Sequence, residues 1–455
     1  MKPTFQTALL RRRHWLAAAT LLVVATAALV LRAAHAPDTP AAAVTPYPHD
    51  LAQVSFTVAG DVIPHEAVRN AAAAAGEGTS GWTALFSGVA DLFHAADFGF
   101  VNLETPVAPQ HDHGTRAFLF DAPLALPEAL KASGVKIVSF ANNHAMDQGW
   151  AGFAETRQHL RELGLIFAGT SDGASDALQP VFTEAHGIKI GWLGITRWLN
   201  GNRNPDDPAA PHVNLYAYPG EVGAATGPTA EQILAAIKAA RAQCDLLVVS
   251  MHWGVEYATT PRAEDVALAH AMLDAGASVI VGHHPHVLQS VETYRTQDGR
   301  NTVIFYSLGN FLSNQSRGYV DGLMPDATGD PRDALIAQFS AVRRDYGPAG
   351  IKVELGHVGI LPVWGENNRN LIAAGRAKTP VIRPVLIDRE IPRLQKELDA
   401  LEADGSDPAV FPAEKKKKYV ELTTQLKLLT DRRALILNRT GDEYLAAPPK
   451  LPVKP

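Results

Sequence analysis

Cysteine is almost absent from this chain of 455 residues, in which Cys244 is the one example. An internal disulfide is therefore excluded, and the folded state has to be stabilised by a packed core. Cys244 stands beside the apolar run 246–249 and not at a helix start or in a polar loop. This setting disfavours a catalytic thiol and predicts a buried one.

Charged residues are also scarce, since they make up 19% of the chain against 46% for hydrophobic residues. This composition is typical of a globular protein with a large core, and the length favours one main domain with appendages. The formal net charge of -6 gives no electrostatic reason to expect nucleic acid as a partner. No repeat with a period of about 20–50 residues is found, which argues against a solenoid or a propeller.

Near the N-terminus, Arg11–Arg13 precede an apolar stretch at Trp15–Leu31. This pattern is typical of an export signal or a membrane anchor, and we assign it to residues 1–36. Residues 37–52, rich in Pro and Ala, are predicted to form a tether. Pro37 suits signal cleavage poorly, so we favour a single span in the cell membrane with the main domain outside the cytoplasm. The alternative is a secreted or periplasmic protein after cleavage.

Short apolar runs alternate with amphipathic segments through the middle of the chain, which predicts an α/β fold. The strands are expected at 54–59, 98–103, 136–141, 188–196, 246–251, 278–281 and 302–308, and the helices at 85–95, 124–133, 152–163, 230–242 and 262–275. Nearly continuous apolar strands indicate sheets covered on both faces, and ligands bind beyond the carboxyl ends of such strands. The loop 200–229 is expected as a surface insertion near that edge.

The pattern changes after about residue 385, where two charged amphipathic helices are expected at 390–403 and 414–433. We assign residues 385–455 to a C-terminal helical extension. The run Lys415–Lys418 within it is interpreted as a solvated helix face.

Residues with metal-ligand chemistry stand at or just past the ends of the apolar segments. They are Asp61, Glu104, Asn143, His144, His252, His284 and His286. Carboxylate, amide and imidazole groups suit divalent ions such as Mn, Fe, Zn or Mg, and strand ends hold such groups around one crevice. The sequence therefore predicts a divalent metal site. In an extended chain His283 would point away from His284 and His286, so we expect a supporting or structural role for it.

Six motifs carry a resemblance to a known family. They are Val58–Asp61, Asn102–Pro106, Ala141–Gly149, His252–Tyr257, Gly282–Gln289 and Ser307–Phe311. With them the chain resembles the CapA family, the poly-γ-glutamate capsule biosynthesis proteins. The resemblance implies a metallophosphatase-like sandwich of two β-sheets flanked by helices, which we assign to residues 53–366.

The resemblance also implies roles for single residues. Asp61, Glu104, Asn143, His252, His284 and His286 would bind one or two divalent ions, with Glu104 as the bridging carboxylate. The resemblance also implies His144 as an acid or transition-state partner. If ions are bound, His144 or Glu256 would handle the proton. From the residue itself, Asp147 could orient His144 or cap the helix that follows. The reaction would be hydrolysis of a phosphoester or of a γ-glutamyl amide, and the partners would be capsule synthase subunits and a polyanionic polymer.

Several positions depart from this family pattern or allow more than one interpretation. Ile63 stands where a two-metal phosphoesterase would supply a ligand, and His65 could replace it only if the loop turned back. Phe118 and Phe120 fit either a substrate groove or the buried face of a strand, and Asp121 replaces an expected basic residue. The alternatives to a capsule hydrolase are therefore a non-catalytic scaffold of a capsule synthesis complex and a generic metallophosphoesterase.

Overall fold

The computed structural model describes residues 47–111, 118–403 and 405–446. The predicted signal or anchor at 1–36 and most of the tether lie outside this range. Within the described ranges, no helix is both long enough and apolar enough to span a membrane. Residues from Asp50 onward form one compact unit, which is described by itself.

The larger of the two main sheets has eight strands, in the order β16-β15-β14-β1-β2-β3-β4 with β13 paired to β1. Strands β1, β2, β3 and β4 are parallel to one another, whereas β14, β15 and β16 form an antiparallel edge. The bounds are β1 His49–Val62, β2 Phe98–Leu103, β3 Val135–Ser139, β4 Ile166–Ala168, β13 Asn310–Leu312, β14 Asp333–Asp345, β15 Ile351–Asn367 and β16 Ile382–Leu386.

A six-stranded sheet has the order β11-β12-β10-β9-β7-β6, in which β7, β9, β10 and β12 are parallel. The bounds are β6 Val181–Ala185, β7 Ile188–Thr196, β9 Leu246–His252, β10 Val279–His283, β11 Val291–Arg295 and β12 Asn301–Phe305. A small ribbon pairs β5 Thr170–Ser171 with β8 His212–Val213.

The two large sheets pack face to face around aromatic side chains. Trp192 of β7 stacks on Phe100 of β2 with ring centroids 5.7 Å apart, and Phe56 of β1 lies 5.8 Å from the same indole. These rings belong to one buried cluster that draws on both sheets. Burial of such large apolar surfaces is the main stabilising contribution to the fold.

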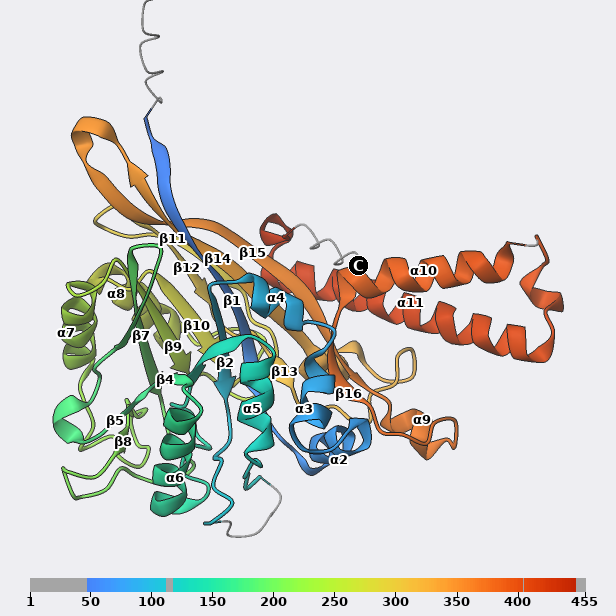
Figure 1. The fold of residues 1–455 in the computed structure, drawn as a ribbon, viewed down its shortest axis with the longest axis horizontal. Helices are drawn as coiled ribbons and strands as arrows, with labels where there is room; N and C mark the ends of the chain where they lie inside the picture. Colours follow the sequence, from blue (N-terminus) through green and yellow to red (C-terminus); the bar gives the residue numbers. More distant parts are fainter. Residues whose placement is uncertain (1–46, 112–117, 404, 447–455) are drawn as a thin grey trace, which may run out of the picture. The chain divides into compact units, whose positions relative to one another are not determined.

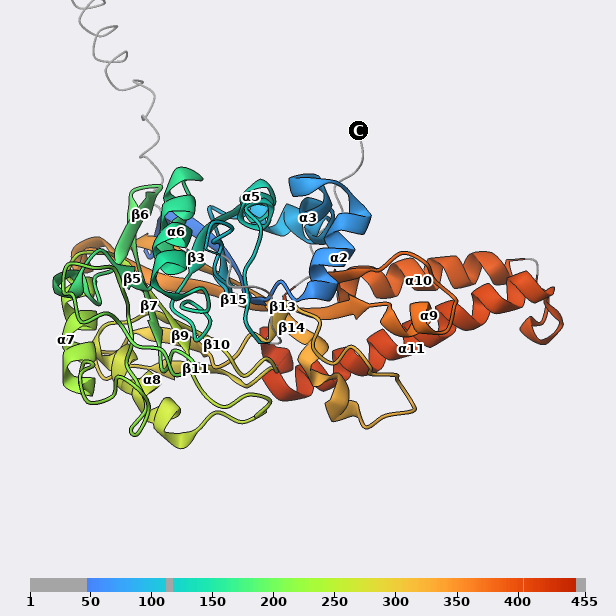
Figure 2. The same ribbon diagram turned by 90° about the horizontal axis from the view of Figure 1, so that it is seen from below.

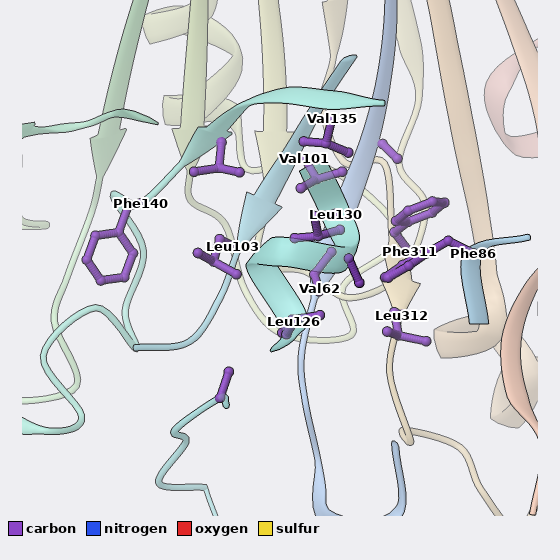
Figure 3. Packing of buried hydrophobic residues seen from close by; sticks show 14 of the residues in the cluster. Val62, Phe86, Val101, Leu103, Leu126, Leu130, Val135, Phe140, Phe311 and Leu312 are labelled. Atoms are coloured by element: carbon purple, nitrogen blue, oxygen red, sulfur yellow. The ribbon is translucent and has the colours of Figure 1, made fainter. Parts of the chain in front are cut away.

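Helices cover the outer face of each sheet (Figure 1, Figure 2). The outer face of the eight-stranded sheet packs under α2–α6, where Val101, Leu103, Leu126 and Leu130 meet in the cluster of Figure 3. Helices α7 and α8 cover the other sheet. The bounds are α2 Glu66–Ala75, α3 Gly78–Phe86, α4 Ala90–Ala95, α5 Ala125–Ala132, α6 Gly149–Glu162, α7 Ala230–Arg241, α8 Ala263–Ala275 and α9 Arg369–Ala373. The predicted two-sheet sandwich flanked by helices is confirmed.

Two helices form the predicted C-terminal hairpin, α10 Ile387–Glu402 and α11 Ala413–Thr440. They lie side by side in Figures 1 and 2 and share the inter-sheet core through Leu394 and Leu429. The fully buried Arg432 of α11 binds Asp333 of β14 and Asp330. The extension is therefore fixed to the eight-stranded sheet by apolar packing and by a buried ion-pair network.

Two details differ from the sequence prediction. The helix expected at 85–95 is broken into α3 and α4, because Ser87 caps the carbonyl of Ala84 with its own hydroxyl and Gly88 has low helix propensity. The eight-stranded sheet continues past residue 366, since β16 pairs with β15 from Ile382 to Leu386. Cys244 is buried as predicted, and burial raises the pKa of its thiol.

Candidate metal centre

The predicted ligands meet where the parallel strands of both sheets end. Asp61 lies in β1 and Glu104 directly follows β2, while His252 ends β9 and His284 directly follows β10. Asp61 pairs in register with Asn102, and His252 with His283. Since parallel strands present their carboxyl ends at one edge, the two sheets bring these side chains to one crevice.

A local irregularity of β1 sets the position of Asp61. The register of β1 against β2 shifts between Val58 and Asp61, and the Asp61 N–H donates to the carbonyl of Gly309 at 3.1 Å. A Cβ atom at Gly60 would lie 1.9 Å from that same carbonyl oxygen. Only glycine at position 60 therefore permits the close approach that places the Asp61 carboxylate at the edge.

The ligands form three overlapping groups, and within each group the ligand atoms lie within 4.8 Å of one another. The first contains Asp61, Glu104 and His286, and the second contains Glu104, His252 and His284. The third contains Glu256, His284 and His286. Glu104 belongs to both of the fully buried groups, so its carboxylate would be available to an ion held by either of them.

Asn102 lies between the two buried carboxylates. Its Nδ2 donates to Asp61 Oδ1 at 2.8 Å and to Glu104 Oε2 at 3.3 Å, and its Oδ1 accepts from Asn142 at 3.3 Å. The side chain is fully buried. Such contacts fix ligand orientation around a metal.

The carboxylates and imidazoles of the centre have strongly displaced pKa values. Burial, followed by the charge of Asp61, raises the pKa of Glu104 well above its ordinary value. Burial opposes ionisation of Asp61, but hydrogen bonds with His283 and His286 outweigh it and hold its pKa well below the usual range. Burial lowers the pKa of His252 and His284, so both imidazoles are neutral, as metal ligands must be.

The residues present fit a divalent metal. Glu104 Oε1 and His284 Nδ1 are buried and have no hydrogen-bond partner among the described residues. A buried charged or polar atom without a partner is costly, and a cation between Asp61, Glu104 and the imidazoles would satisfy these atoms. Because the donors include imidazole nitrogens as well as oxygens, they suit Mn, Fe or Zn better than they suit Mg, which prefers oxygen ligands.

Asn143 lies next to the second of these groups. Its Oδ1 is 2.8 Å from His252 Nε2, and its Nδ2 donates to Asn200 Oδ1 at 3.1 Å. The amide oxygen and the imidazole nitrogen are therefore in hydrogen-bonding contact with each other. This contact is compatible with the predicted role of Asn143 as an amide ligand.

His144 forms a dyad with Asp147. Nδ1 of His144 lies 2.7 Å from Asp147 Oδ2, and the same carboxylate oxygen accepts the N–H of Phe120 at 2.7 Å. The Phe120 ring packs on the imidazole at 4.4 Å. Asp147 thus fixes the orientation of His144 and leaves Nε2 for proton exchange. This contact fits the orienting role, one of the two alternatives that the sequence left open for Asp147.

Glu256 is the one exposed member of the three groups. The sequence predicted a role in proton transfer for it, and its carboxylate lies close enough to His284 and His286 to reach an ion that they bind. The neighbouring Tyr257 is half-exposed and lies 6.1 Å from His286, ring centroid to ring centroid. The open side of the centre is therefore at Glu256.

His283 does not point away, which corrects the sequence expectation. The chain is not extended here, because His284 and His286 adopt positive φ values of 94° and 59°. As a result His283 Nδ1 lies 3.3 Å from Asp61 Oδ1, while His286 Nδ1 lies 3.3 Å from Oδ2. Non-glycine residues in this conformation are strained, and such strain concentrates at functional sites.

Ile63 and His65 supply no ligand to any of the three groups within the described residues. Ile63 is buried, and its N–H donates to the carbonyl of Leu312. His65 Nδ1 accepts the N–H of Asn314 at 3.3 Å, and its ring packs edge-on against Phe120. His65 is thus a loop residue that supports the wall of the site.

Sequence reasoning missed three residues of the site. Asn102 stood inside a quoted motif but received no role. Trp198, whose ring packs at 4.0 Å on His284, and Asn200, which binds Asn143, follow the end of β7. Their place just past a parallel strand was the available signal.

A large cleft of about 1620 Å³ opens beside the metal ligands. Its walls include Phe120, Tyr257 and Val287, each of which adjoins or contacts a residue of the centre. His65, whose ring packs against Phe120, also lines it. Phe118, 80% exposed, also lines it. Both phenylalanines of the 118–120 segment therefore face the cleft, as the substrate-groove interpretation expected.

Comparison with known proteins gives the family. Residues 55–315 match the family described as Bacterial capsule synthesis protein PGA_cap. The chain is 30% identical over 278 residues to Capsule biosynthesis protein CapA of Bacillus anthracis, covering 60% of this chain and 63% of that protein. It is 34% identical over 238 residues to PGA biosynthesis protein CapA of Bacillus subtilis (strain 168), covering 52% and 58%.

Among solved structures, the 5'-nucleotidase from Candida albicans is similar with a TM-score of 0.33 and 9% identity, covering 65% of this chain and 52% of that one. This similarity is too low to say anything about activity. The family match, in contrast, spans the whole region that supplies Asp61, Glu104, Asn143, His252, His284 and His286. The chain belongs to the PGA_cap family of bacterial capsule synthesis proteins.

Proposed function

We propose that this protein is a membrane-anchored, extracytoplasmic metal-dependent hydrolase of capsule or poly-γ-glutamate biosynthesis. The observation that carries the proposal is the sharing of Glu104 by two buried ligand groups at one sheet edge. Together with the open side at Glu256, this arrangement suits a catalytic centre better than a closed structural one.

Each residue has a role in this proposal. Asp61, Glu104, Asn143, His252, His284 and His286 would hold one or two divalent ions, and Asn102 would hold Asp61 and Glu104 in place. A bound ion would supply an activated water and polarise the bond to be cut. His144, oriented by Asp147, gives or takes a proton at Nε2, and Glu256 is the second candidate for that step.

The bond cut is a γ-glutamyl amide or a phosphoester. The names of the relatives favour a capsule polymer, and the cleft beside the centre is larger than the roughly 300–1,000 Å³ that accommodates small ligands. We place the main domain outside the cytoplasm because residues 1–36 carry the export pattern of the sequence.

The test is the metal content of the full chain beside a His284→Ala/His286→Ala variant. An exposed pair elsewhere, His94→Ala/His357→Ala, is the matched control. We expect one or two ions per chain in the protein and its control and loss of metal in the ligand variant. Hydrolysis of γ-glutamyl amides and phosphoesters should then depend on the same ion.

A second function, a non-catalytic scaffold in a capsule synthesis complex, is favoured by one observation. Ile63 is buried and leaves no side-chain ligand at its position. The scaffold would be supported if no metal bound even after incubation with Mn or Zn, or if metal bound while no amide or phosphoester were cut.

A further inference from the structure

The cleft beside the metal centre carries an excess of cationic side chains. Of the charged residues that line it, four are basic and three are acidic. The basic ones are Arg69, Arg317, Arg369 and Lys378, and the acidic ones are Glu66, Asp121 and Asp330. The protein as a whole has a net charge of -6, so this balance is opposite to that of the chain.

Three of the basic side chains are not neutralised. No carboxylate of the described residues lies within ion-pairing distance of Arg317, Arg369 or Lys378. They come from separate parts of the chain, namely the loop after β13, the first residue of α9 and the segment after α9, yet line one cleft. Cations that have no partner in the protein are available to a ligand.

Asp330, one of the three acids that line the cleft, is neutralised by two arginines that do not line it. Asp330 Oδ1 accepts from Arg432 at 2.8 Å, and its Oδ2 accepts from Arg439 at 2.8 Å. Both arginines belong to α11. The C-terminal hairpin therefore removes a negative charge that would otherwise oppose an anion in the cleft.

The other two acids that line the cleft are Asp121 and Glu66. Asp121, which departs from the basic residue expected of the family, accepts the N–H of Ala108 at 2.8 Å, and Arg69 donates to its carbonyl. Glu66 is exposed in the first turn of α2. Aromatic rings at Phe120 and Tyr257 connect the cationic part of the cleft to His144 and His286.

We infer that the cleft is a binding site for a linear polycarboxylate. In this proposal Arg317, Arg369 and Lys378 bind the free carboxylates along the polymer, while the polymer runs past Phe120 and Tyr257 to the metal ligands. A volume of about 1620 Å³ fits several residues of a polymer and not a single metabolite. This inference rests on the proposed function for the choice of carboxylate over phosphate.

The experiment measures fluorescence anisotropy of labelled poly-γ-glutamate with the full chain, in EDTA and with Mn. The test variant is Arg317→Gln/Arg369→Gln/Lys378→Gln. The control variant, Lys415→Gln/Lys416→Gln/Lys417→Gln, removes the same charge from α11 outside the cleft. We expect affinity to fall about 10- to 100-fold in the test variant and less than about 3-fold in the control.

One further variant tests the role of the C-terminal hairpin. Arg439→Gln should weaken binding by a few-fold, because it leaves Asp330 with one arginine.

Polyphosphate and neutral dextran test the ligand class, and tighter binding of polyphosphate than of poly-γ-glutamate would overturn the carboxylate assignment. Equal losses in the test and control variants would overturn the site. Because binding is measured in EDTA as well, a protein that binds polymer but cuts nothing contradicts the hydrolase and leaves the cleft assignment standing.

Discussion

The Asn102 side chain donates hydrogen bonds to Asp61 Oδ1 at 2.8 Å and to Glu104 Oε2 at 3.3 Å. One amide thus holds two buried carboxylates that would otherwise repel each other. Since position 102 pairs in register with position 61 across β1 and β2, the bridge is built into the parallel sheet.

Replacing Asn102 should weaken metal binding without removing a ligand. We expect Asn102→Ala to lower metal affinity by about 10- to 100-fold, because Asp61 and Glu104 lose the group that orients them. Competition with a metal-sensitive chelating dye would measure the change. Asn142→Ala, which removes the bond to Asn102 Oδ1, should have a smaller effect, and the reverse order would contradict the bridge.

Replacing Glu104 by a neutral amide should stabilise the metal-free protein. Burial and the charge of Asp61 raise the pKa of Glu104, which costs free energy on folding because the carboxyl is ionised in the unfolded state at neutral pH. Glu104→Gln removes this cost and should raise the free energy of unfolding in EDTA by about 1–2 kcal/mol. Saturating metal should stabilise the wild type by about 3 kcal/mol at 100 times Kd and the variant much less. Thermal unfolding with and without Mn tests both, and equal metal responses would argue against Glu104 as a ligand.

Breaking the buried network of the C-terminal hairpin should be costly. Arg432→Met leaves Asp333 buried without its partner, and we expect a loss of about 3–5 kcal/mol in urea unfolding. Arg433→Met is the matched control, since the pair of Arg433 with Asp388 is partly exposed and contributes about 1 kcal/mol or less. Similar losses in both variants would show that the network is not what fixes α11.

Acid should destabilise the protein through His65. Burial, followed by the nearby His286, lowers the pKa of His65 to about 4 from its ordinary 6.5. The unfolded state therefore binds the extra proton first, and stability is lost as pH falls from about 6.5 towards 4. His65→Asn, which keeps an acceptor for the Asn314 N–H, should reduce the loss between pH 6.5 and 5 by about 1–2 kcal/mol. An unchanged pH profile of urea unfolding would contradict this assignment.

Much of the fold followed from local patterns. The predicted strands at 98–103 and 188–196 coincide with β2 and β7, because runs of β-branched and aromatic residues buried on both faces have a clear signal. Strands β14, β15 and β16 were not predicted. They form the antiparallel edge of the sheet, and pairing across the long β14–β15 hairpin, not local sequence, defines them.

The candidate site was likewise predictable in part. Its ligand types were readable because strand ends carried them, whereas His283 was misplaced because the backbone turns at His284 and His286. The sequence also gave no sign that His65 would bind Asn314, 249 residues away.

The sequence by itself determined the α/β alternation, the C-terminal helices and the set of residues with ligand chemistry, since hydrophobic periodicity and residue type are local properties. The two-sheet sandwich followed from the family resemblance. Only the tertiary structure decided that Asn102 bridges the carboxylates and that Glu256 completes the third group of ligands. It also decided that arginines of α11 neutralise Asp330 in the wall of the cleft. These relationships join atoms from distant parts of the chain, so they depend on strand register and loop conformation, which short-range patterns do not encode.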